Sequence, residues 1–369
     1  MKSDLLTPLW SRLQSAPAPT YTVREWETLL GQARQSRLMG RLATYFVDHG
    51  GIDAVPLGPR RHLLAALRWV DRQHHAVRWE VDCIGKALAG QQGPVLLLKG
   101  AAYLAAGLPP SRARLFADID LMVERDRITE VEGALLAAGW ISTDRDVYTQ
   151  RYYREWMHEI PPIEHVHRHS VIDLHHTITP PTSRFNVDGS RLLAQRVAVV
   201  DGGRFCVLSP VDMVLHSAVH LFQEGEFDHG LRDLLDMNDL LLHFGQRQDF
   251  WDELLARAQD LKLKIPLFHA LFHVRRLFGT VAPEALQPAV AALQPHWLPR
   301  VVMSALLSRA LYPHHPSCDP PGGGLARWLL YVRSHYIRMP LRLVIPHLIR
   351  KAWMRNFAKT EGSNADPKP

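Results

Sequence analysis

Two aspartates separated by one residue, inside a short apolar run, constrain the fold of this chain more than any other feature. Asp118 and Asp120 flank Ile119, and the run continues to Val123. A strand is expected over 115–123, and its period of two places both carboxylates on one face. Two carboxylates this close repel each other unless a cation lies between them, and carboxylate oxygens suit Mg²⁺. The motif therefore predicts a metal site, with a solvated strand face as the alternative.

The segment before this motif predicts a strand, a glycine turn and a helix. Apolar residues 95–98 form the expected strand, Gly100 the turn, and small residues 101–106 the helix. Backbone N–H groups at such a turn can hold a phosphate, although a plain tight turn is the alternative. Lys99 is either a phosphate ligand or a cap on the sheet edge.

Two arginines lie in the loop that leads to the aspartates. Arg112 and Arg114 precede Asp118 by six and four residues. Guanidinium groups at that position could neutralise the charge of a triphosphate. The alternative is that both side chains lie on the surface of an ordinary loop.

A third carboxylate, Asp173, lies in the clearest alternating pattern of the chain, a strand expected over 164–176. Asp173 and His175 share its polar face, and Ile172 and Leu174 lie on the opposite face. His175 is the better candidate for acid–base chemistry beside the proposed centre. The three other histidines of this face favour an exposed edge strand over a zinc or iron site; they are His165, His167 and His169.

The organisation predicted around these motifs is α+β. Residues 1–92 form helices, including one after the Thr22–Glu25 capping box and a long one from Pro59. The α/β core spans 93–209, with a strand hairpin expected over 140–143 and 147–157. Helices are expected in the next domain, 210–312; they cover 212–222, 231–244, 250–261 and 265–278. A linker and basic aromatic helical segment, 313–360, and a disordered tail, 361–369, complete the chain.

Charge is unevenly distributed along the chain. The formal net charge of the 369 residues is +6. Residues 320–360 contain eight Lys or Arg and no acidic residue, which leaves −2 for the rest. Specific nucleic-acid binding is therefore not predicted. The interpretations of 325–358 are a peripheral contact with an anionic membrane surface, or a helical hairpin packed on the domain.

Cysteine content and hydropathy suggest a cytoplasmic protein. The three cysteines are far apart, which fits a reduced compartment better than a disulfide scaffold. The N-terminus shows no signal-peptide pattern. No apolar run approaches the ~20 residues that span a bilayer. We expect a cytoplasmic location, with a peripheral position at the inner membrane surface as a further option.

Together these motifs resemble a known family. Residues 98–102, the block from Arg114 through Asp118 and Asp120, and the helix that ends in Gly139 are similar to the uncharacterised bacterial nucleotidyltransferases of the polymerase-beta superfamily. The resemblance covers roughly residues 60–244, and 172–175 resembles the strand that carries the family's third carboxylate. One departure is Ala101, where the wider superfamily usually has a second Gly or a Ser.

The resemblance implies a mixed sheet with flanking helices and transfer of a nucleoside monophosphate from an NTP to an acceptor hydroxyl or phosphate, with release of pyrophosphate. Asp118, Asp120 and Asp173 would be catalytic and would bind two Mg²⁺. The residues expected to bind the nucleotide are Lys99, Gly100, Ala101, Arg112, Arg114 and His175. The acceptor is unknown. The alternatives are a non-catalytic nucleotide sensor or scaffold with the same fold, and toxin-type nucleotidylation of protein or RNA.

Overall fold

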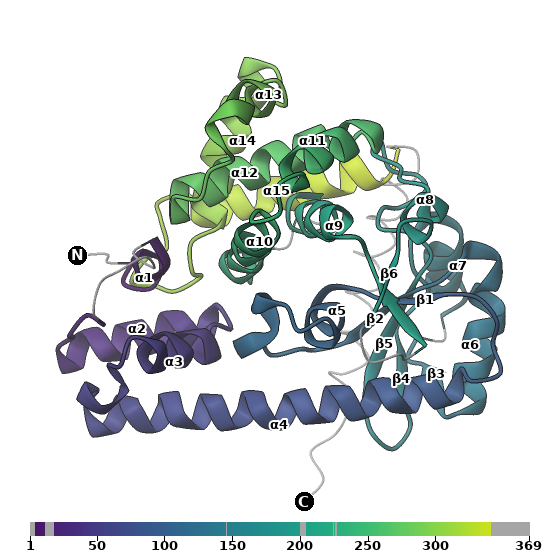
Figure 1. Ribbon diagram of the computed structural model, residues 1–369, viewed down its shortest axis with the longest axis horizontal. Coiled ribbons are helices and arrows are strands. Elements are labelled where there is room, and N and C mark those ends of the chain that lie inside the picture. The colour runs from purple at the N-terminus through teal and green to yellow at the C-terminus, as the bar shows by residue number, and fades with distance from the viewer. Residues whose placement is uncertain are drawn as a thin grey trace, which may run out of the picture.

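The computed structural model describes residues 4–11, 18–144, 146–199, 204–223, 225 and 227–340. The expected tail, 361–369, and the second half of the basic segment, 341–360, lie outside these described residues. Helices dominate both ends of the described chain, and a sheet lies between them (Figure 1).

The N-terminal region is helical, as predicted. Its elements are α1 (Thr7–Ser11), α2 (Val23–Gln35), α3 (Met39–Asp48), η1 (Ile52–Ala54) and α4 (Leu57–Ala87). The capping box forms, because Thr22 accepts from the backbone of Glu25 and the Glu25 carboxylate accepts from the backbone N–H of Thr22. α4 contacts α2, α3, α5 and α6, so one long helix links this region to the sheet (Figure 1).

The described residues of the middle region contain a seven-stranded mixed sheet. Its strands are β1 (Val95–Leu97), β2 (Ile119–Met122), β3 (Trp140–Ser142), β4 (Ile163–His165), β5 (Val171–His175), β6 (Val197–Ala198) and β7 (Phe205–Val207). Their spatial order is β3-β4-β5-β2-β1-β7-β6. β2 runs parallel to β5 and antiparallel to β1, and β1 runs parallel to β7. These short strands are largely buried, which explains their continuous apolar runs.

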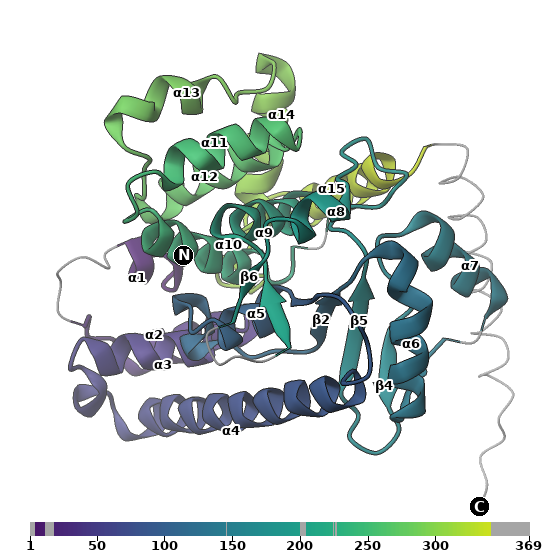
Figure 2. The same cartoon turned by 45° about the vertical axis from the view of Figure 1, so that its right-hand side comes forward.

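Short helices connect the strands. They are α5 (Lys99–Ala105), η2 (Pro109–Ala113), η3 (Arg125–Arg127), α6 (Ile128–Ala137), α7 (Val147–Trp156) and α8 (Gly189–Leu193). Figure 2 shows α6 and α7 beside β4 and β5, at the end of the molecule opposite α2 and α3.

Two strand predictions were wrong in this region. Residues 147–157 form α7 instead of a strand, because Asp146 caps the helix by accepting from the backbone N–H of Thr149. The single strand expected over 164–176 is a hairpin of β4 and β5, with a turn in which His169 has a φ of 56°. His165 is consequently buried, whereas the other expected edge histidines lie in the turn.

Helices pack together again after the sheet. They are α9 (Pro210–Gln223), α10 (Gly230–Phe244), α11 (Phe250–Asp260), α12 (Lys264–Phe278), η4 (Glu284–Leu286), α13 (Gln287–Ala291), α14 (Trp297–Ala310) and α15 (Gly323–Arg338). The four helices predicted over 212–278 are confirmed. α15 packs against α14 and α9, and Arg333 donates to the carbonyl of Phe222 at 2.8 Å. Within the described residues, no helix is both long and apolar enough to cross a membrane.

Candidate active site

The turn between β1 and α5 is held close to the loop before β2. Lys99 has a φ of 44°, in the left-handed region that residues with a side chain rarely adopt. At Gly100, a Cβ atom would lie 2.3 Å from a ring carbon of Phe116. Glycine is therefore required at this position because the aromatic ring occupies the space of a side chain.

Phe116 is in turn fixed by α4. The Gln73 side chain accepts from the backbone N–H of Phe116 at 2.8 Å and donates to its carbonyl at 2.5 Å. The adjacent His74 ring contacts the carbonyl of Arg114 through Nε2 at 2.9 Å. Two neighbouring residues of the long helix thus set the path of the loop that leads to Asp118.

The three aspartates lie on two adjacent parallel strands. Asp120 is the register partner of Asp173, so their side chains lie on the same face of the sheet. Asp118 immediately precedes β2 and lies two residues from Asp120. The structure therefore brings together the three carboxylates that the sequence singled out.

The electrostatics of the three carboxylates differ. Burial, with repulsion from Asp120 and Glu159, raises the pKa of Asp173 to about 7. Burial and the charge of Asp120 also raise the pKa of Asp118. Burial would raise the pKa of Asp120 as well, but the charge of Lys99 and a hydrogen bond from His175 outweigh it and hold that pKa well below its ordinary value.

Asp120 is the central residue in a short series of polar contacts. Lys99 Nζ donates to Asp120 Oδ1 at 2.8 Å, and His175 Nε2 lies 3.1 Å from the same oxygen. The other ring nitrogen of His175, Nδ1, lies 3.3 Å from Glu159 Oε2. The sequence did not predict Glu159, because it lies between the two strands expected over 147–157 and 164–176 and belongs to neither pattern. The contact with His175 therefore fixes the orientation of the Asp120 carboxylate.

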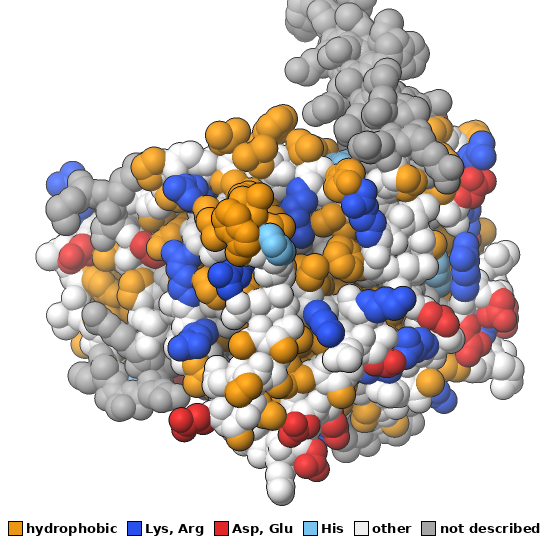
Figure 3. Space-filling model, turned by 90° about the horizontal axis from the view of Figure 1, so that it is seen from above, with side chains coloured by type: hydrophobic (Ala, Val, Ile, Leu, Met, Phe, Trp, Pro, Cys, Tyr) orange, Lys and Arg blue, Asp and Glu red, His pale blue; other side chains and the backbone are white. Residues whose placement is uncertain are grey.

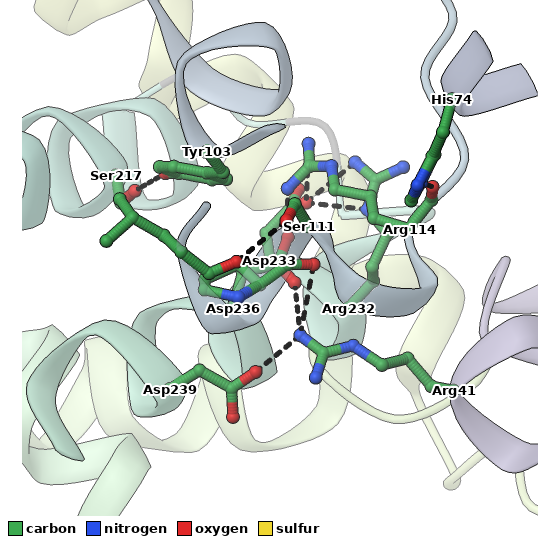
Figure 4. Close-up of polar contacts among 12 residues, drawn as sticks. Arg41, His74, Tyr103, Ser111, Arg114, Ser217, Arg232, Asp233, Asp236 and Asp239 are labelled. Carbon is green, nitrogen blue, oxygen red and sulfur yellow. Dashed lines mark hydrogen bonds and ion pairs between the residues drawn. The ribbon is translucent and has the colours of Figure 1, made fainter. Parts of the chain in front are cut away.

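Arg114 is held in a buried network of ion pairs. It pairs with Asp236 of α10, and Arg41 of α3 lies 3.0 Å from the same carboxylate. Arg232 lies 2.6 Å from Asp233, which is also 4.0 Å from Arg114. Figure 4 shows these arginines directed at the acidic side of α10. Arg232 and Asp236 lie four residues apart on α10, but they do not pair with each other, because Arg232 pairs with Asp233 and Asp236 pairs with Arg114.

These elements enclose a pocket of about 270 Å³. Lys99, Gly100, Arg114, Asp118 and Asp120 line it, as the sequence suggested. Five lining residues of the region after the sheet were not assigned to the site from sequence; they are His220, Asp228, His229, Arg232 and Asp233. Helical periodicity could have placed some of them on one face, but not beside the sheet.

Three of the expected nucleotide ligands lie elsewhere. Arg112 pairs with Asp48 at 2.7 Å, away from the pocket. Ala101 is buried in α5, so only its backbone can take part. His175 is buried behind Asp120 and does not line the pocket. Asp173 does not line it either, although it lies beside Asp120 in the sheet.

The carboxylates fit a divalent cation. Oδ1 of Asp173 is buried and has no hydrogen-bond partner within the described part of the chain. An unpaired carboxylate oxygen beside two further carboxylates is costly unless positive charge is supplied. All three donors are hard oxygens, which Mg²⁺ prefers.

Three neighbouring carboxylates beside a pocket that also holds Lys99, Arg114 and Arg232 make a site suited to a cation and a phosphorylated ligand. A model of the family described as uncharacterised nucleotidyltransferase matches residues 22–279, from the first long helix to the end of α12. The match includes more than half of the chain, so the chain belongs to this nucleotidyltransferase family. It is a transferase, and the family does not define its acceptor. A search of curated proteins gives no match.

Proposed function

We propose that the protein is a Mg²⁺-dependent nucleotidyltransferase that moves a nucleoside monophosphate from an NTP to an acceptor hydroxyl or phosphate and releases pyrophosphate. The observation that carries the proposal is the set of Asp118, Asp120 and Asp173 on one face of adjacent strands, beside a pocket with Lys99 and Arg114. The proposal includes a polymerase-beta-like core over 93–209, with the helices of 1–92 and 210–312 covering it.

The carboxylates hold the metal ions in this proposal. Asp118, Asp120 and Asp173 bind two Mg²⁺, which when bound activate the attacking oxygen and neutralise the leaving pyrophosphate. Asp120 is already oriented by His175, so its geometry is fixed before substrate binds. Asp173 completes the set from the neighbouring strand.

The basic side of the pocket binds the triphosphate. Lys99 supplies positive charge at the junction between carboxylates and pocket, and the Gly100 turn lets phosphate approach the backbone. Arg114 adds a guanidinium, and Arg232, which lines the same pocket, is a second phosphate ligand. Arg112 is left out because its partner, Asp48, lies away from the pocket.

The test is transfer and pyrophosphate release from each of the four NTPs, labelled at the α-phosphate, with and without Mg²⁺. Self-nucleotidylation and extracted cell fractions supply candidate acceptors. Asp118→Asn is expected to abolish release. The matched control is Asp126→Asn, an exposed carboxylate just beyond β2 that does not line the pocket. Equal release by wild type and Asp118→Asn would refute the catalytic proposal.

Two other candidate functions give different outcomes. A non-catalytic nucleotide sensor or scaffold binds NTP and its partner without turnover. Toxin-type nucleotidylation transfers label to a protein or RNA in the extracted fractions. Three neighbouring carboxylates favour catalysis, because a sensor gains nothing from like charges that repel one another.

We also propose a cytoplasmic location with a peripheral contact at the inner membrane surface. Within 325–340, exposed apolar side chains include Leu325 and Trp328, which are 62% and 58% exposed. Figure 3 shows hydrophobic side chains interspersed with Lys and Arg on the face seen from above. Sedimentation with anionic vesicles tests the contact, and a protein that stays in solution would contradict it.

A further inference from the structure

A second group of potential ligands converges beside the three carboxylates, at the end of β5. One ligand atom from each of His158, Glu159 and His175 lies within 4.8 Å of the other two. His175 Nδ1 is 3.3 Å from Glu159 Oε2, and His158 Nε2 is 3.8 Å from the same oxygen. In the proposed function, His175 only orients Asp120, and His158 and Glu159 have no role.

The backbone holds this group in place. Residues 158–160 run antiparallel beside the end of β5, with Glu159 bridged to His175. The N–H of Ile160 donates to the carbonyl of Leu174 at 3.0 Å, and the N–H of His176 donates to the carbonyl of His158 at 2.9 Å. The three side chains are therefore brought together by sheet-like pairing and not by chance contact of mobile loops.

One ring nitrogen of each of the two buried histidines makes no hydrogen bond within the described residues. His158 and His175 are 7% and 1% exposed, and this nitrogen is Nδ1 in both rings. When His175 donates from Nε2 to Asp120, a neutral ring leaves a lone pair on Nδ1 that faces the Glu159 carboxylate. A positive charge between these two electron-rich atoms, either a metal ion or a proton on Nδ1, relieves their repulsion, and the three converging ligand atoms suit a metal ion.

The donor set selects the kind of cation. Two imidazole nitrogens and one carboxylate oxygen are ligands of Zn²⁺ and similar transition metals, whereas Mg²⁺ prefers oxygen alone. Ligand distances of about 2.0–2.1 Å place the donor atoms of a tetrahedral zinc site about 3.3 Å apart. The 3.3 Å separation of His175 Nδ1 and Glu159 Oε2 matches that edge, and the 3.8 Å separation needs only a small closure.

We propose that His158, Glu159 and His175 form a binding site for one transition-metal ion of the zinc class, separate from the three aspartates. His175 then has two partners, the ion at Nδ1 and Asp120 at Nε2. A metal-bound imidazole with its other nitrogen hydrogen-bonded to a carboxylate is fixed in tautomer and orientation. The ion therefore positions Asp120 through His175.

The test is Co²⁺ and Zn²⁺ binding by the full chain after treatment with a chelator, in excess Mg²⁺. Visible absorption reports Co²⁺ bound by nitrogen and oxygen ligands, and equilibrium dialysis measures Zn²⁺. We expect one ion per chain in the wild type. His158→Gln and Glu159→Gln should each weaken binding by about 100-fold, since each removes one of three ligands. Glu159 is the less buried of the two, so its variant remains informative if His158→Gln fails to fold.

Two controls separate this site from its surroundings. His176→Gln changes the residue that follows His175. The ring of His176 contacts the carbonyl of Met157 and not the cluster, so this variant should bind Co²⁺ as the wild type does. Asp118→Asn should also bind Co²⁺ normally, even if nucleotide transfer is lost or was never present. The proposal is overturned if the wild type binds neither ion, or if Asp118→Asn loses the Co²⁺ signal while His158→Gln keeps it.

Discussion

Replacement of Gly100 by alanine should damage the protein through one defined contact. The added Cβ would lie 2.3 and 2.7 Å from two ring carbons of Phe116, more than 1 Å inside ordinary contact distance. The ring cannot simply move away, because Gln73 holds the backbone of Phe116 through both its N–H and its carbonyl. Overpacking of this kind costs about 1–3 kcal/mol.

A smaller gain opposes that cost. Alanine is favoured over glycine inside a helix by about 1 kcal/mol. The expected net loss in free energy of unfolding for Gly100→Ala is therefore about 0–2 kcal/mol. Phe116 also lies two residues before Asp118, so a displaced ring shifts the first carboxylate. We expect affinity for Mg²⁺–NTP to fall by about tenfold, equivalent to about 1.4 kcal/mol.

Urea unfolding followed by circular dichroism measures the stability change, and calorimetry measures the nucleotide affinity. Gly133→Ala is the matched control, because Gly133 lies in α6 with no atom within 4 Å of an added Cβ. It should stabilise the protein by about 0.5–1 kcal/mol. In a Phe116→Ala background, Gly100→Ala should no longer destabilise. The reasoning fails if Gly100→Ala stabilises the wild type as Gly133→Ala does.

Three further predictions follow from single contacts. Asp236→Asn removes the carboxylate that Arg114 and Arg41 share, and their remaining partners are Asp233 at 4.0 Å and Asp239 at 2.5 Å. It should cost about 1–3 kcal/mol in urea unfolding, and no measurable loss would contradict the network. Burial lowers the pKa of His273 to about 3, so as the pH falls below about 6.5 the unfolded chain binds a proton that the folded chain does not. His273→Phe should therefore abolish about 2 kcal/mol of the stability that the wild type loses between pH 7 and 5. An unchanged pH dependence of stability would refute this. Arg112→Ala removes an exposed ion pair and should change stability by less than about 1 kcal/mol. The affinity for NTP in calorimetry should be unaltered, and a tenfold loss of affinity would show that Arg112 belongs to the nucleotide site.

Sequence periodicity was sufficient for the elements whose apolar pattern is regular. The helices over 212–278 were predicted near their observed bounds, whereas the strand carrying Asp120 was expected over 115–123 and is only Ile119–Met122. Residues 147–156 were misread because tyrosine and valine favour strands. A side-chain cap from Asp146 and an edge-to-face contact between Tyr152 and Trp156, one helical turn apart, support the helix instead.

The candidate site was predicted only where its residues are local in sequence. To predict Asp118 and Asp120 as site residues, it was enough to recognise one strand. To add Asp173, it was enough to recognise a second strand with alternating polar and apolar residues. The partners of Arg114 could not be predicted, because Asp236 lies 122 positions further along the chain. Glu159 was also missed, because its closeness to His175 depends on pairing between an irregular segment and β5. Contacts of this kind are set by tertiary packing and not by local pattern.

The most direct measurement of the central claim is binding of each NTP, with and without Mg²⁺, to the wild type and to Asp118→Asn. Calorimetry gives the affinity, and a shift in thermal unfolding confirms it, since a ligand that binds only the folded state raises its stability. The account predicts Mg²⁺-dependent binding of at least one NTP that is lost in Asp118→Asn and kept in Asp126→Asn. Binding that is independent of Mg²⁺, or equally strong in Asp118→Asn, would contradict a metal-dependent nucleotide site at these carboxylates.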